Sequence, residues 1–117
     1  MARLAHGPGC YACTDPVAAA AQLAAERAVF EVEAVRAREH RVVGEALDVR
    51  ARDNLVAGRG GAAALLDGRA LQHFQVANAL GSGVRFSRAH LERVVAAHPK
   101  VAAGLAVLTD EATGGGV

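Results

Sequence analysis

The two cysteines of this chain, Cys10 and Cys13, lie in a C-x-x-C sequence with His6 four residues upstream of Cys10. Thiolate and imidazole are ligands that zinc prefers, and a C-x-x-C turn can bring two sulfurs to one ion. The stretch therefore offers three candidate metal ligands. A fourth ligand would have to come from a distant part of the chain, where four histidines are candidates: His40, His73, His90 and His98.

A strong zinc signature has two paired half-sites, and this sequence holds only one. A redox role is also disfavoured, because a thioredoxin-type C-x-x-C opens a helix, whereas this pair precedes the helix start at Asp15-Pro16. We therefore expect Cys10 and Cys13 to be two small thiols that pack in an N-terminal arm, with no cofactor. Zinc bound by His6, Cys10 and Cys13 is the alternative.

Catalytic motifs are absent from the sequence, which contains no G-x-S-x-G, no phosphate-binding loop and no H-E-x-x-H. The glycine-rich stretch at 58–69 lacks both the G-x-G-x-x-G spacing and the Lys-Ser/Thr of a P-loop. Glu31 and Glu33 would point to different sides of a helix and would not form a carboxylate pair. We expect a protein that is not an enzyme.

A long helix is predicted over about 16–57. Asp15 is a good N-cap, Pro16 suits the first helical position, and the "GRGG" at 58–61 ends the segment. Gly44 is a candidate break. The alternative is an α+β fold with a hairpin in 29–52, because "FEVEA" and "LDVRAR" alternate apolar and polar residues. The helix is preferred because Glu, Arg and Ala favour helices and no Asn-Gly or Asp-Gly lies where the turn of the hairpin would be.

The rest of the chain predicts a compact set of short helices over 62–108, giving a mainly α fold. Gly81 would end one helix, and Ser87 would cap the next, with Phe86 packing on Leu91 as a hydrophobic staple. Pro99 would start the last helix. The predicted organisation is an arm (1–15), a single helical domain (16–108) and a glycine-rich tail (109–117).

A repeat with alternating spacings of four and three residues runs from Ala28 to Val56, the seam period of a coiled coil. An amphipathic helix packed on its own domain would show the same repeat. We predict an interface between subunits, formed by six of the seven apolar members of the repeat: Val32, Val35, Val42, Ala46, Val49 and Val56.

Composition favours association. Apolar residues make up 52% of the chain but aromatic residues only 3%, so the core must consist of Ala, Val and Leu, which bury little area each. With 13 basic and 12 acidic residues, the chain has no overall charge that would attract nucleic acid or a membrane. Locally, Arg85, Arg88 and Arg93 lie in a stretch that loosely resembles helix-turn-helix.

These features together predict a non-enzymatic structural subunit that acts as a homo-oligomer or within a larger multi-copy assembly, such as a virion or compartment. The start "MARLAHG" has no apolar segment of the kind found in secretory signals, so an intracellular or particle-associated location is expected. The alternative function is a DNA-binding regulator that is stabilised by zinc or uses a helix-turn-helix.

Overall fold

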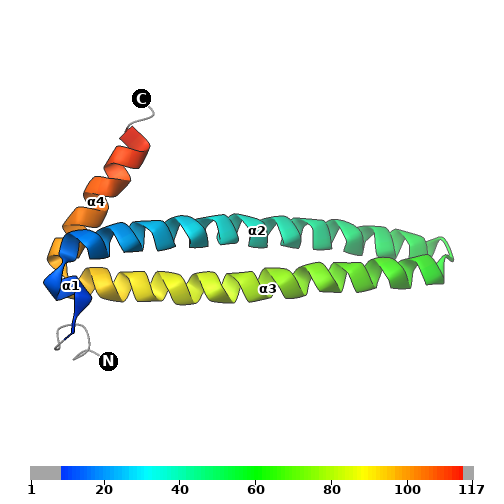
Figure 1. Ribbon diagram of the computed structural model, residues 1–117. Coiled ribbons are helices and arrows are strands. Elements are labelled where there is room, and N and C mark those ends of the chain that lie inside the picture. The colour runs from blue at the N-terminus through cyan, green and yellow to red at the C-terminus, as the bar shows by residue number, and fades with distance from the viewer. Residues whose placement is uncertain (1–8, 115–117) are drawn as a thin grey trace. The chain divides into compact units, whose positions relative to one another are not determined.

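The computed structural model describes residues 9–114, with side chains described as far as residue 110. This part of the chain contains four helices and no strand: α1 (Tyr11–Thr14), α2 (Pro16–Val56), α3 (Gly60–Ala97) and α4 (Pro99–Gly114) (Figure 1). The prediction of a mainly α fold is confirmed. The alternative hairpin in 29–52 is wrong, because α2 runs through the whole of that range.

The ends of α2 follow from local capping signals in the sequence. Asp15 caps the helix, since its Oδ1 accepts a hydrogen bond from the Ala18 N–H at 3.1 Å. At the other end, Gly58 adopts a φ of 79°. The Gly58 N–H donates to Leu55 O at 3.0 Å and the Arg59 N–H to Asn54 O at 2.8 Å, which is the Schellman pattern of helix termination.

Gly44 does not break α2, and the structure gives a packing reason for the glycine. A Cβ placed at residue 44 would lie 2.8 Å from Cε1 of Phe74, a ring of α3. The helix therefore passes over the ring at a distance that only glycine allows. An internal glycine costs a helix about 1 kcal/mol relative to alanine, which packing along its length can offset.

The predicted short helices over 62–108 are wrong, because α3 is one continuous helix of 38 residues. Gly81 and Gly83 lie inside it, between the buried Ala77 and Val84. Helix packing thus overrides the local preference of glycine for a turn. Phe86 is exposed in mid-helix, so the predicted staple at a helix start does not exist.

The break at Pro99 is confirmed, since α4 begins there. The helix then continues to Gly114, well into the segment that was predicted as a tail from residue 109. His98 is the single residue between α3 and α4.

The chain divides into two compact units, which we describe separately. Unit 1 contains α1, α2 up to Phe30, and the chain from Arg85 onward, which includes the end of α3 and all of α4. Unit 2 spans Glu31–Val84. Both units share α2 and α3, so this division does not test the predicted domain boundaries.

Unit 1 has a core in which α2 meets α4. The buried side chains of this core come from two short stretches: Ala19, Ala20 and Leu23 of α2 with Val101 and Leu105 of α4. A Cβ at Gly104 would lie 3.0 Å from the Cβ of Ala20, so the two helices approach closely at this point.

Unit 2 is an antiparallel helical hairpin, in which α2 and α3 lie side by side and are joined by residues 57–59 (Figure 1). Its buried residues are almost all small: Ala34, Gly44, Ala51, Ala63, Ala70, Ala77 and Val84. On α3 they recur every seven residues, which is the period of a helix seam. Small residues allow the two backbones to approach closely, but each buries little apolar area.

Candidate functional sites: a cysteine–histidine cluster and an exposed valine face

The one-turn helix α1 fixes the two cysteines relative to each other. Cys10 is the N-cap residue, and its Sγ accepts a hydrogen bond from the Cys13 N–H at 3.2 Å. Its carbonyl oxygen accepts from the Thr14 N–H at 3.1 Å and from Thr14 Oγ1 at 2.6 Å. Backbone and side-chain hydrogen bonds of this turn therefore fix the two cysteines relative to each other.

His98 lies between the end of α3 and the start of α4. Its N–H donates to Val94 O at 3.0 Å, and its carbonyl oxygen accepts from the Ala102 N–H at 3.0 Å. The residue is only 7% exposed. Because Pro99 follows directly, the position of His98 is set by the end of α3 and by the fixed first turn of α4.

The imidazole of His98 reaches both cysteines. Cys10 Sγ lies 4.0 Å from Nε2, and Cys13 Sγ lies 3.9 Å from Nδ1. One ligand atom from each of the three residues lies within 4.8 Å of the other two. Neither cysteine is in a disulfide. We call Cys10, Cys13 and His98 the Cys–His cluster; it belongs entirely to unit 1.

The pKa of the Cys13 thiol is raised above the ordinary value, first by a hydrogen bond with the Cys10 side chain and then by partial loss of solvent around the Cys13 sulfur. Both effects favour the neutral thiol over the thiolate in the metal-free chain.

The sequence predicted two of the three members of this cluster. His6, the third predicted ligand, lies outside the described residues. Of the four distant histidines, His98 is the one that meets the cysteines; His90 is exposed on α3. In unit 2, His40 and His73 contact each other, with their Nδ1 atoms 2.9 Å apart.

The predicted interface residues form an exposed surface on α2 in unit 2. Val32, Val35, Val42, Val49 and Val56 are 43% to 89% exposed, and Ala46 between them is exposed as well. We call these six residues the valine face. Gly44, which packs on α3, is two residues beyond Val42 and so about 200° around the helix. The valine face thus points away from the hairpin seam.

The three arginines of the predicted nucleic-acid site are exposed on the last part of α3. No turn separates two helices there, so the helix-turn-helix prediction is wrong. Arg88 stacks over the Phe30 ring, with Cζ 5.7 Å from its centroid, a cation–π contact within unit 1. Arg85 and Arg93 lie on the same continuous helix.

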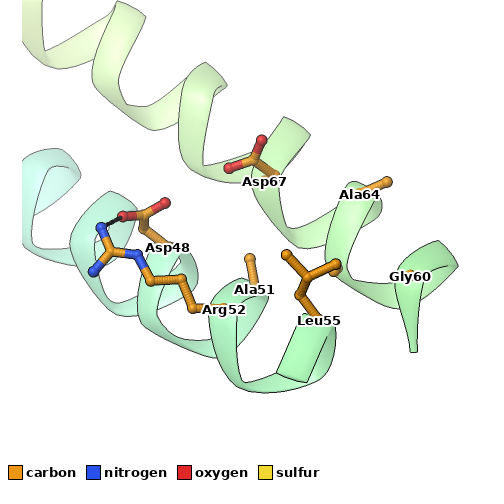
Figure 2. Close-up of a pocket in the computed structure, with 8 residues that line it drawn as sticks. Asp48, Ala51, Arg52, Leu55, Gly60, Ala64 and Asp67 are labelled. Atoms are coloured by element: carbon orange, nitrogen blue, oxygen red, sulfur yellow. Dashed lines mark hydrogen bonds and ion pairs between the residues drawn. The ribbon is translucent and has the colours of Figure 1, made fainter. Parts of the chain in front are cut away.

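A hollow of about 300 Å³ lies in unit 2 near the α2–α3 connection. Figure 2 shows that Ala51 and Leu55 of α2 line it, with Asp67 contributed by α3. Arg52 and Asp48 form an ion pair on α2, Nη2 to Oδ2 at 2.7 Å, so these two charges already compensate each other. We assign no ligand to this hollow.

Comparison with protein families, with curated protein sequences and with solved structures gives no match. Within the described residues, no helix combines the length and the apolar character that crossing a membrane requires. The function must therefore be argued from the Cys–His cluster and the valine face.

Proposed function

We propose that this chain is a non-enzymatic helical subunit that self-associates through the valine face of unit 2, as a homo-oligomer or as a component of a larger multi-copy assembly. The observation that carries the proposal is the exposure of five valines in a folded chain whose helices pack by their opposite side. A row of apolar side chains at seam spacing on an exposed helix face is typical of helix–helix interfaces.

The composition of unit 2 supports a need for a partner. The buried positions of the hairpin are alanine and glycine except for Val84. Apolar burial contributes about 25 cal/mol per Å², so a seam of small residues contributes little, while the five valines of the valine face remain exposed to water. A second pair of helices over the valine face would bury those side chains.

A second copy of the same chain is the partner that the pattern favours. Val35 and Val49 lie seven residues on either side of Val42. An antiparallel pairing centred on Val42 would therefore place Val35 of one copy opposite Val49 of the other, as a two-fold interface requires. The near balance of 13 basic and 12 acidic residues leaves no large net repulsion between copies.

Val42→Asp tests the proposal. An unpaired carboxylate in an apolar interface costs several kcal/mol, so the dissociation constant should rise about a hundredfold or more. Analytical ultracentrifugation should show an oligomer for the parent chain and a monomer for the variant at the same concentration. Circular dichroism should show that the variant keeps its helix content, because the hairpin seam is untouched.

Val76→Asp is the matched control. It makes the same substitution on α3, the other helix of unit 2, outside the valine face and at a side chain that is 42% exposed. It should leave the oligomer intact. Arg41 would be a poorer control, because its Nη2 donates to Asn78 Oδ1 at 3.2 Å across the hairpin. A monomeric parent chain, or equal behaviour of the two aspartate variants, would contradict the proposal.

A further inference from the structure

We infer that Cys10, Cys13 and His98 form a binding site for a zinc-like divalent metal ion, which fastens the N-terminal turn of unit 1 to the α3–α4 junction. This inference is independent of self-association through unit 2. It rests on three donor atoms that converge from two segments more than 80 residues apart in the sequence.

The distances are close to those of a metal site. Zinc binds thiolate sulfur at about 2.3 Å and imidazole nitrogen at about 2.0 Å, which puts sulfur and nitrogen about 3.5 Å apart in a tetrahedron. The two observed separations are 4.0 and 3.9 Å. The first separation is to Nε2 of His98 and the second is to Nδ1, and a metal binds one of these two nitrogens. When the metal binds Nε2, the buried Cys10 and His98 stay in place and the exposed side chain of Cys13 moves toward Nε2.

The chemistry of the donors selects the class of metal. Two sulfurs and an imidazole are soft or borderline ligands, which favour Zn²⁺ and Co²⁺ over Mg²⁺ or Ca²⁺. Carboxylates, which the harder ions prefer, are not part of the cluster. The described residues supply three ligands, so a water molecule or a ligand from outside these residues completes the tetrahedron. Binding replaces the two thiol protons, which pass to solvent.

The residues of the cluster are already held close to the positions that metal binding requires. The Cys13 N–H already donates to Cys10 Sγ, and such a hydrogen bond stabilises negative charge on the sulfur. His98 is held by the backbone of two helices, and both of its ring nitrogens face a sulfur. A metal would therefore cross-link the turn to the junction with little rearrangement of the chain.

Cobalt titration of the full chain tests the inference. The protein is stripped with a chelator, kept reduced with a phosphine, and titrated with Co²⁺. We expect one Co²⁺ per chain, a sulfur-to-cobalt charge-transfer band, visible bands of tetrahedral Co²⁺, and displacement of the cobalt by Zn²⁺. Zinc at about 100 times its dissociation constant should raise the Tm by roughly 10 °C.

Three variants locate the site. Cys13→Ser changes an exposed side chain and should weaken Co²⁺ binding at least tenfold and reduce the charge-transfer band, with unchanged helix content. His98→Gln should also weaken binding at least tenfold. His90→Gln, on α3 and outside the cluster, should bind as the parent chain does.

Two results would overturn the inference: a folded parent chain with no sulfur-to-cobalt band, or a Cys13→Ser variant with parental affinity. If His98→Gln does not fold, Cys13→Ser decides alone. Repeating the titration on Val42→Asp separates the two proposals, because metal binding in unit 1 should persist in a chain that no longer associates.

Discussion

Val101 of α4 is fully buried in unit 1, whereas Val107 on the same helix is 56% exposed. Val101→Ala removes two carbon atoms from the buried cluster that contains Ala20 and Leu23 and leaves a cavity. The lost burial and the cavity together should lower the free energy of unfolding by about 2 kcal/mol. Urea unfolding monitored by circular dichroism measures this loss.

Val107→Ala is the matched control, because it makes the same change at an exposed position of the same helix. Its effect should stay within about 0.5 kcal/mol. Equal losses in the two variants would mean that the α2–α4 contact is not the core of unit 1.

His98 shows where residue-level prediction fails. The sequence marks Cys10 and Cys13 by their spacing, but it presents four distant histidines with no local feature that distinguishes a ligand. Of these four histidines, His98 is the one that lies between two helices and faces the turn of α1. Both properties depend on tertiary packing. The neighbouring Pro99 was the one local signal that fixed its backbone.

At the scale of the helices, the seven-residue period of α2 was predictable, but the buried seam was not. Periodicity analysis finds the large apolar residues, and these form the exposed valine face. The residues that pack on α3 are Ala34, Gly44 and Ala51, whose weak hydrophobicity hides them in the sequence. The glycines inside α3 suggested a break that does not exist, because helix packing overrides the local preference of glycine for a turn.

Gly44→Ala tests the close approach of α2 and α3. A new Cβ would lie 2.8 Å from the Phe74 ring, and overpacking of this kind costs about 1–3 kcal/mol. The gain in helix propensity is about 1 kcal/mol. We therefore expect a net destabilisation of about 1 kcal/mol, measured by thermal or urea unfolding, and partial recovery in Gly44→Ala/Phe74→Leu.

Gly68→Ala on α3 provides the comparison, because a Cβ there meets no atom within 4 Å. This variant should be stabilised by up to about 1 kcal/mol. If both glycine variants are stabilised equally, the two helices of unit 2 do not approach as closely as the structure indicates.

At the scale of the whole chain, the two proposals give each unit a different source of added stability. Unit 1 has a small core and the Cys–His cluster, and unit 2 has a seam of small residues and the valine face. Stabilisation by a ligand grows with its concentration relative to its dissociation constant, and stabilisation by a second copy grows with protein concentration. The two proposals therefore predict separate responses in separate segments.

Hydrogen exchange followed by mass spectrometry can resolve these responses. Zinc at about 100 times its dissociation constant should slow exchange about a hundredfold in residues 10–30 and 85–110, where amides exchange through opening of unit 1. Raising the protein concentration should slow exchange in residues 31–84 instead. Cys13→Ser should reduce the zinc response about tenfold or more and keep the concentration response, because its substitution leaves the valine face unchanged. Val42→Asp should do the reverse, because the Cys–His cluster lies entirely in unit 1. If zinc and concentration protect the same segments in both variants, the two units do not have independent sources of stability, and the assignment of one site to each unit fails.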